Sequence, residues 1–254
     1  MTIDPQTGQD SAATAATEQL LRRDLAAALR LAALYGWQDQ LATHTSVRLP
    51  GPCAHFLINP YGLLFEEITA STLVVVDATG QLLSPSPHGI NRAGFIIHSA
   101  IHHAREDAQC VIHLHTIAGS AVAAQREGLR PISPGAMYFS GRLGYHDWEG
   151  VTVLPSEQSR IVANLGKHMG LIFRNHGTLT VGRTVGEAFE RMYVLEKACQ
   201  IQVAAGSDAG ELIVPQQAAI DCVHPQLSAF GDIAGITWSA LLRRLERTEP
   251  TYQK

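Results

Sequence analysis

Two histidines separated by a single leucine are the first feature of the chain that could do chemistry. His113 and His115 lie in 111–115, an apolar run whose length and β-branched content are typical of a buried strand. Alternate side chains of a strand point to the same face, so both imidazoles can reach one ion. A third histidine, His176, follows another apolar segment within 174–177, where the glycine favours a tight turn.

Three imidazoles form a ligand set that suits zinc, iron and copper, and manganese is also compatible with it. Spacing alone leaves a second interpretation open, because the chain has 12 histidines and a His-x-His pair can simply be packed or lie on the surface. His113, His115 and His176 are therefore candidate ligands of one divalent ion, for which zinc is the first expectation and iron or manganese are alternatives.

The composition limits the classes of partner. With 254 residues, 46% of them hydrophobic, one large domain is expected. A net charge of −4 and the lack of a Lys/Arg run argue against nucleic acid and against a membrane surface as partners. The start is polar and acidic rather than signal-like, the apolar runs are too short to span a bilayer, and the four cysteines lie far apart. We therefore expect a cytoplasmic protein without a disulfide framework.

The pattern of apolar residues divides the chain into three parts. Residues 1–17 are small and polar and are predicted to be a disordered tail. Helical and strand-like periods then alternate irregularly over 18–230, which predicts a mixed α/β domain, and 231–254 is expected to form a helical tail. The clearest elements are a helix that starts near Glu18, a strand over 110–115, strands on either side of His176, and helices over 94–103, 185–204 and 238–245.

Three blocks of sequence resemble the class II aldolase/adducin family in order and spacing: 110–116 (CVIHLHT), 173–182 (FRNHGTLTVG), and the stretch that runs from Asn59-Pro-Tyr-Gly62 to Asp77. Segments 90–101 and 144–150 resemble the adducin-head branch and its bacterial relatives in particular. The resemblance implies a three-layer α/β/α domain with a central, largely antiparallel sheet. It also implies a metal held by the three histidines and a homo-oligomer, a tetramer, with sites near subunit interfaces.

The sequence departs from the sugar-phosphate aldolases of this family at several positions. Where those enzymes carry a Ser-Ser-Glu segment, the chain reads Arg92-Ala93-Gly94, so the acidic metal ligand and base implied by the resemblance is absent. Asn59 stands where the phosphate loop has a threonine, and 44–46 reads His-Thr-Ser in place of Asn-x-Ser. These differences predict that the substrate is not a sugar phosphate.

Other polar residues are candidates for contacts with a substrate. A planar guanidinium can pair with a carboxylate, although an arginine at a helix start can also be purely structural. Imidazole and phenol groups can serve as general acids near a metal, although each can equally be structural. We predict that substrate is bound by Arg92, Asn59 and Gly62, and that the proton donors come from His44, Tyr145 and His146. His98 is expected to be a hydrogen-bonded core histidine, and His102 a surface residue.

Together these features predict a metal-dependent lyase that acts on a small, non-phosphorylated carboxylate by decarboxylation or aldolase-type C–C cleavage. Three neutral ligands leave the charge of the ion uncompensated, which favours an anionic substrate. Two alternatives use the same residues. One is a non-haem iron oxygenase with the same three-histidine site, and the other is a non-enzymatic interaction module of the adducin type.

Overall fold

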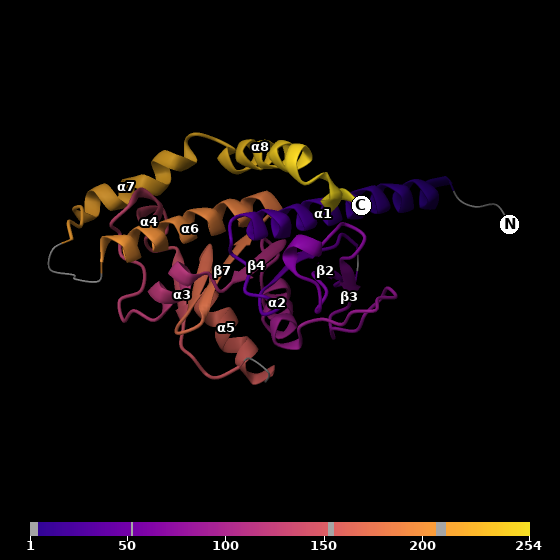
Figure 1. Ribbon diagram of the computed structural model, residues 1–254, viewed down its shortest axis with the longest axis horizontal. Coiled ribbons are helices and arrows are strands. Elements are labelled where there is room, and N and C mark those ends of the chain that lie inside the picture. The colour runs from indigo at the N-terminus through magenta and orange to yellow at the C-terminus, as the bar shows by residue number, and fades with distance from the viewer. Residues whose placement is uncertain (1–4, 52, 152–154, 207–211) are drawn as a thin grey trace.

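The computed structural model places a seven-stranded sheet between two layers of helices (Figure 1). The structure describes residues 5–51, 53–151, 155–206 and 212–254, and for residues 5–14 the backbone alone. The strand order is β3-β2-β1-β4-β7-β6-β5, and every neighbouring pair is antiparallel except β5 and β6. The strands are β1 (His44–Arg48), β2 (Phe56–Ile58), β3 (Val74–Val76), β4 (Cys110–Leu114), β5 (Leu143–His146), β6 (Gly170–Phe173) and β7 (Gly177–Gly182). The predicted three-layer α/β/α architecture with a largely antiparallel sheet is confirmed.

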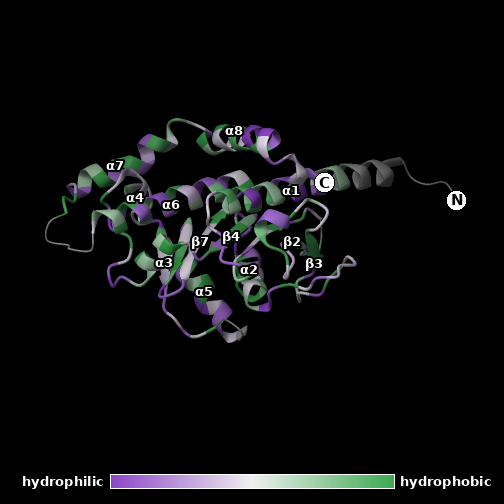
Figure 2. Ribbon diagram, viewed as in Figure 1, coloured by the Kyte–Doolittle hydropathy of each residue, from purple (hydrophilic) through white to green (hydrophobic). Residues whose placement is uncertain are grey.

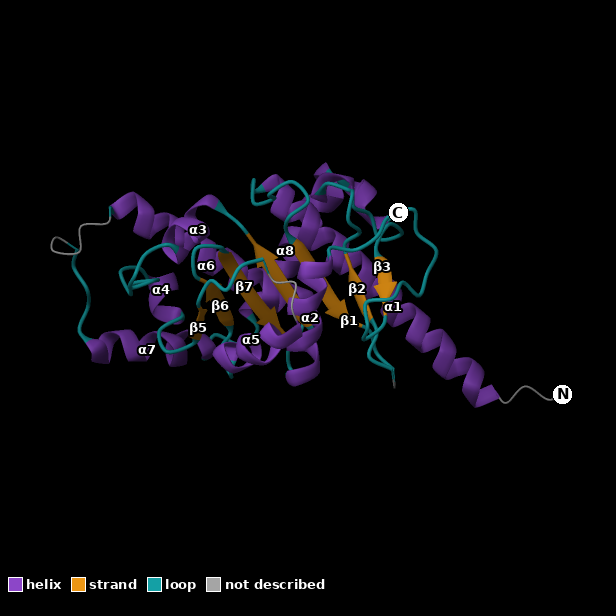
Figure 3. Ribbon diagram, turned by 90° about the horizontal axis from the view of Figure 1, so that it is seen from below, coloured by secondary structure: helices purple, strands orange, loops and turns teal. Residues whose placement is uncertain are grey.

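The helices divide between the two faces of the sheet. The α-helices are α1 (Pro5–Leu34), α2 (Arg92–Ala104), α3 (Ile117–Ala123), α4 (Pro134–Tyr138), α5 (Gln158–Leu165), α6 (Val185–Ala205), α7 (Gln217–Ser228) and α8 (Ile233–Thr248). Three short 3₁₀ helices cover Phe65–Glu67, Pro155–Glu157 and Pro250–Gln253. Helices α2 and α5 cover one face of the sheet, whereas α1, α6 and α8 lie on the other (Figures 1 and 3).

Successive side chains of β4 point alternately into the hydrophobic clusters on the two faces of the sheet. Ile112 and Leu114 point into the cluster that also contains side chains of α1 and α6, whereas Val111 points to the α2 and α5 side. His113 therefore lies on the α2 and α5 face, because neighbouring residues of a strand point to opposite faces. Figure 2 shows the hydrophobic colouring concentrated in the central strands around β4. The apolar core thus surrounds the strand that carries the first of the three histidines.

Helices occupy the described residues near both ends of the chain, and the helix at the C-terminal end was expected. Helix α1 begins at Pro5, inside the segment expected to be disordered, and the alanines at 12, 13, 15 and 16 explain this by their high helix propensity. Residues 1–4 lie outside the described residues. The C-terminal segment contributes to the main core, since Trp238, Leu245 and Tyr252 are buried against α1 and α6. The backbone N–H of Ala70 also donates to Tyr252 O at 2.8 Å, which ties the C-terminus to the domain.

Strand β4 ends at Leu114, so His115 lies just beyond the strand in which it was predicted. Thr116 then caps α3, its side-chain oxygen accepting from the N–H of Gly119 at 3.1 Å. The sharp change from strand to helix explains why the ladder stops before His115. Among the described residues, no helix is long and apolar enough to cross a membrane.

Candidate metal centre

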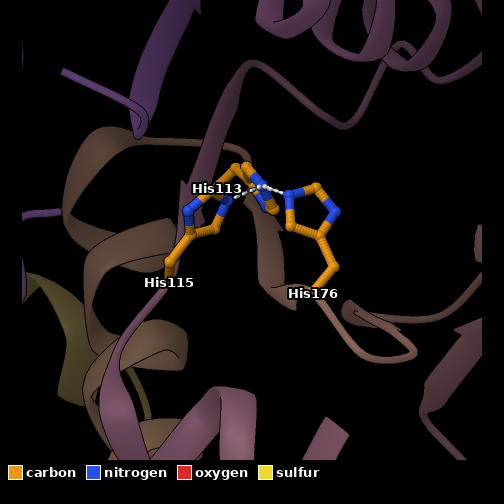
Figure 4. A group of neighbouring side chains, drawn as sticks. All are labelled: His113, His115 and His176. Atoms are coloured by element: carbon orange, nitrogen blue, oxygen red, sulfur yellow. Dashed lines mark hydrogen bonds between the residues drawn. The ribbon is translucent and has the colours of Figure 1, made fainter. Parts of the chain in front are cut away.

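The three predicted histidines converge at the end of β4 (Figure 4). Nε2 of His113 lies 3.0 Å from Nε2 of His115 and 3.4 Å from Nε2 of His176. One ligand atom from each residue lies within 4.8 Å of the other two. His113 is fully buried, whereas the other two side chains are partly exposed, so the group lies at the rim of the core.

Hydrogen bonds at Nδ1 fix the orientation of the rings of His113 and His115. Nδ1 of His113 donates to the backbone oxygen of Thr178 at 3.0 Å, since a carbonyl can only accept. Nδ1 of His115 lies 3.0 Å from the Asp39 carboxylate and donates to it in the same way. The unprotonated Nε2 of His113 therefore faces the Nε2 atoms of His115 and His176. Burial and the neighbouring imidazoles lower the pKa of His113 well below its usual value and that of His176 to about 4, which keeps both rings neutral.

Three ring nitrogens that converge on one point can hold a cation between them. Tetrahedral ligands at about 2.0–2.1 Å from a zinc ion would lie roughly 3.3 Å apart, which is close to the observed nitrogen separations. The carboxylate and carbonyl partners on Nδ1 are also those that metal-binding histidines commonly have. The residues present fit a divalent ion. Among the residues that the structure describes, no fourth His, Cys, Asp or Glu belongs to the group.

The turn between β6 and β7 brings His176 to the strand. Asn175 adopts a left-handed conformation with φ of 58°, so this residue, and not the predicted glycine, makes the turn. Gly177 is required for a different reason. A Cβ at this position would meet the backbone oxygen of Leu114 and lie 2.9 Å from Cδ2 of His115. The missing side chain lets the turn approach the end of β4 closely enough for the rings to meet.

His44 lies beside the three histidines. It is the direct cross-strand partner of His113 in the β1–β4 ladder, and the two ring centroids are 5.0 Å apart. The ring of His44 also occupies the space where a side chain of residue 94 would begin, because a Cβ at Gly94 would lie 2.5 Å from its Nε2. The absent acidic side chain and the position of His44 are therefore structurally connected.

The other two predicted proton donors are placed differently. Tyr145 packs on the α3 and α6 side of the sheet, opposite to the face of His113, and its hydroxyl accepts from the N–H of Leu129 at 3.1 Å. His146 lies on the same face as His113, but both of its ring nitrogens are engaged. One faces the Glu157 carboxylate at 3.2 Å and the other accepts from the Asn164 amide at 2.8 Å. The geometry favours structural roles for both residues.

The predicted substrate-binding residues also differ in their surroundings. Arg92 is exposed in the first turn of α2, near Gly94. Asn59 is buried, and its side chain accepts from the N–H of Thr45 at 2.9 Å and faces the oxygen of Thr43 at 3.5 Å. It thereby clamps the backbone on both sides of His44. Gly62 has φ of 116°, a conformation that favours glycine in the turn.

Several residues near the site were not predicted. Trp148 lies edge-on to His176 with ring centroids 5.4 Å apart, and Phe173 packs against His113 at 5.3 Å. A small recess beside His176 is lined by side chains that include Trp148, Phe173 and Arg174. Asp39 lies 76 residues from His115 along the chain, so no local pattern could have linked the two. The block at 144–150, noted for its resemblance, was the available signal for Trp148.

The matching family model is the class II aldolase and adducin N-terminal domain, and it covers residues 23–203. The chain belongs to this family. A protein of Caulobacter vibrioides named as an aldolase class 2 protein is 49% identical over 233 residues, 91% of each chain. Rat alpha-adducin is 47% identical over 206 residues, which cover 80% of this chain and 28% of alpha-adducin.

Solved structures show the same fold. The crystal structure of an aldolase II superfamily protein from Pseudomonas syringae is 47% identical, with a TM-score of 0.89 and coverage of 99% of this chain and 98% of the other. An L-fuculose 1-phosphate aldolase from Glaciozyma antarctica is 29% identical, with a TM-score of 0.82 and coverage of 95% and 94%. The family is one of metal-dependent, aldolase-type lyases, and the three histidines form the site in this chain that fits such a metal.

Proposed function

We propose that the chain is a metal-dependent lyase that cleaves a carbon–carbon bond in a small, non-phosphorylated carboxylate, most directly by decarboxylation. The observation that carries the proposal is the set of three converging imidazoles, with no acidic fourth member among the described residues. A divalent ion held by His113, His115 and His176, such as zinc, iron or manganese, would supply a Lewis acid whose full charge attracts an anion and stabilises negative charge on its oxygen.

The surrounding residues suit an anionic substrate, and Asn59 argues against a phosphate. Arg92 is exposed in the same turn of α2 as Gly94, where its guanidinium can pair with a second oxygen of the substrate. The side chain of Asn59 is committed to the backbone of Thr43 and Thr45, so it is not directed at a ligand. This arrangement leaves the loop at 59–62 without the polar side chain that a phosphate would require from that position.

A second candidate is aldol cleavage of a sugar phosphate. It is favoured by the L-fuculose 1-phosphate aldolase of Glaciozyma antarctica, which shares 29% of its residues with this chain over 95% of the chain's length. Against it stands Gly94, where the ring of His44 fills the space in which an acidic side chain would start. The two candidates differ in the substrate class, and a single set of assays separates them.

The test uses the metal-analysed full chain with His113→Ala as the background control. Incubation without oxygen with 2-oxo, 2-hydroxy and aromatic carboxylates is expected to release carbon dioxide or an aldehyde from one of them, and L-fuculose 1-phosphate is expected to stay intact. Rapid cleavage of the sugar phosphate would overturn the proposal in favour of the aldolase. Oxygen consumption with bound iron would instead support an oxygenase, and inactivity of the loaded protein throughout would support an adducin-like module.

We also propose a cytoplasmic homo-oligomer, a tetramer, whose subunits meet near the metal centre. Ile117 begins α3 two residues after His115 and is 91% exposed, and Trp148 beside His176 is 51% exposed. Large apolar side chains at such a rim are typical of surfaces that another subunit covers. Light scattering is expected to give four times the mass of the chain, about four times 27.4 kDa. A monomer that becomes no larger with concentration would contradict this.

A further inference from the structure

A second group of histidines lies behind the metal centre, between β1 and α2. His44 is hydrogen-bonded to His98, and the hydroxyl of Ser46 joins His98 to His102. All four side chains are buried, with exposed fractions of 4% or less. His98 is the core histidine that the sequence predicted. His102 is not the surface residue that was expected, because it stacks on Phe56 with ring centroids 4.8 Å apart.

The hydrogen bonds of this group all donate in the same direction, from His44 toward Ala108. The direction is set by the last bond, between His102 and Ala108. Nδ1 of His102 lies 2.8 Å from the backbone oxygen of Ala108, which can only accept, so this nitrogen carries the proton. Burial lowers the pKa of His102 to about 3, so the ring is neutral and its Nε2 is an acceptor. The Ser46 hydroxyl lies 2.7 Å from that Nε2 and must donate to it.

The same reasoning extends from Ser46 to the metal centre. A hydroxyl has one proton, so Ser46 must accept from Nδ1 of His98, which lies 2.5 Å away. His98 is buried and neutral, and its Nε2 therefore accepts from Nδ1 of His44 at 2.8 Å. Each assignment follows from the previous one. His44 is left with its proton on Nδ1 and with an unprotonated Nε2.

Nε2 of His44 points toward Gly94 of α2, next to the metal centre. The ring stands opposite His113 in the sheet, and Nε2 lies 2.5 Å from the place of a Cβ on residue 94. Asn59 holds the backbone on both sides of the ring, so the orientation is set from the main chain as well. His44 is not a member of the three-histidine group, whose ligand atoms all lie within 4.8 Å of one another.

We propose that His98, Ser46 and His102 are positioning residues that hold His44 in a single neutral tautomer, and that its Nε2 is the hydrogen-bond acceptor that the site offers to a hydroxyl group of the substrate. The contact with a substrate hydroxyl rests on the proposed function, whereas the tautomer of His44 does not. Glycine at position 94 is then needed because the imidazole replaces a side chain there. The substrate class narrows to a carboxylate with a hydroxyl next to the reacting carbon.

The test reads the tautomer directly from the nitrogen resonances of the histidine rings in the zinc-loaded, ¹⁵N-labelled full chain. Nδ1 of His44 is expected at the shift of a protonated nitrogen and Nε2 at that of an unprotonated one. Ser46→Ala removes the only hydroxyl of the chain of hydrogen bonds and is expected to bring both nitrogens of His44 to averaged shifts, while bound zinc stays constant. Ser99→Ala is the matched control, because this buried serine of α2 hydrogen-bonds elsewhere and should leave the shifts of His44 unchanged.

Three results would overturn the proposal. A protonated Nε2 in the wild-type chain would do so without any variant, and so would a tautomer of His44 that Ser46→Ala leaves intact. A shift of Nε2 typical of metal coordination would assign this atom to the ion instead of a substrate.

Adding lactate, a 2-hydroxy acid, is expected to move the Nε2 resonance of His44, whereas pyruvate is not. Binding of lactate that leaves this resonance in place overturns the contact with a substrate hydroxyl alone, and loss of all binding of carboxylates refutes the proposed function but not the measured tautomer.

Discussion

Two groups of histidines lie side by side on one face of the sheet, and they differ in how their polar atoms are satisfied. In the metal centre, Nδ1 of His113 donates to the backbone oxygen of Thr178, and its unprotonated Nε2 faces the Nε2 atoms of His115 and His176. In the group behind it, each donor meets an acceptor from His44 through to the oxygen of Ala108. The first arrangement is that of a ligand set that can hold a cation, and the second is a hydrogen-bonded network.

The comparison shows why the number of histidines says little about metal binding. Both groups are rich in imidazole and both are largely buried, yet the direction of the hydrogen bonds separates a ligand set from a core network. The partners on Nδ1 make the difference. A backbone oxygen and a carboxylate orient His113 and His115 toward one point, whereas Ser46 lies between His98 and His102 and serves both rings.

The largest expected effect is on the metal itself. His113→Ala, His115→Ala and His176→Ala should each reduce bound divalent ion from about one per chain to nearly none, because two imidazoles do not retain an ion that three hold. His98→Gln, in the neighbouring group, should keep its metal. Elemental analysis of the folded variants measures both. Full metal content in any two of the three alanine variants would refute the assignment.

Lowering the pH is expected to destabilise the protein through the buried histidines of the neighbouring group. Burial lowers the pKa values of His44 and His102 to about 3, whereas in the unfolded chain they return to about 6.5. Between these values the unfolded chain binds more protons, so the free energy of unfolding falls as the pH drops below 6.5. Each histidine contributes up to about 1.4 kcal/mol per pH unit. Denaturant unfolding of the metal-free protein from pH 7 to pH 4 measures this loss.

Two variants test whether His102 causes the pH dependence of stability. His102→Gln removes one buried titrating group and should give a shallower dependence of stability on pH than the wild-type chain. His103→Ala removes the exposed neighbour on the same helix and should leave the slope unchanged. Equal slopes in the wild-type chain and His102→Gln would contradict the buried, neutral state of this ring.

A smaller effect is expected at the contact between α2 and His44. Gly94→Ala places a Cβ against the imidazole and should destabilise the protein by about 1–3 kcal/mol, the usual cost of overpacking. Gly89→Ala is the control, because nothing lies within 4 Å of its Cβ. Denaturant unfolding compares the two. Equal stability of both variants would show that the space at position 94 is not filled by His44.

Gly94→Glu extends this comparison to the site. The carboxylate should leave the metal bound but displace the ring of His44 and repel an anionic substrate. Metal analysis together with the histidine nitrogen shifts reads both consequences without an activity assay. Unchanged shifts of His44 in this variant would contradict the contact between the two positions.

The family blocks and the periods of apolar residues were sufficient for the architecture and for the three histidines that converge in the structure. His113 and His115 are close in the chain, and His176 could be found because its strand, turn and glycine form a local pattern. Strand β4 and helices α2 and α6 lie where the pattern predicts them, within about two residues at their ends. Such elements are predictable because their periodicity is a local property of the sequence.

The roles of the remaining polar residues required the tertiary structure. His146, Tyr145 and Asn59 have residue types that suit catalysis or binding, but each is hydrogen-bonded to partners that packing supplies. His102 was expected at the surface because its helix face could not be assigned without knowing what lies beside it. Helix α1 was expected to start later, because its polar and alanine-rich first turns have no apolar face to reveal them.

Residue types and local spacing identify which imidazoles can bind a metal, because His113 and His115 are two residues apart at the end of a strand and His176 lies in a short turn between two strands. They do not identify which nitrogen of a ring carries the proton, nor which ring fills the space above a glycine. Those properties depend on the register of β1 with β4 and on the packing of α2 over both strands. Contacts between residues 44, 94 and 98 form only when these elements meet, because hydrogen bonds and steric exclusion act over a few ångströms in space rather than along the chain.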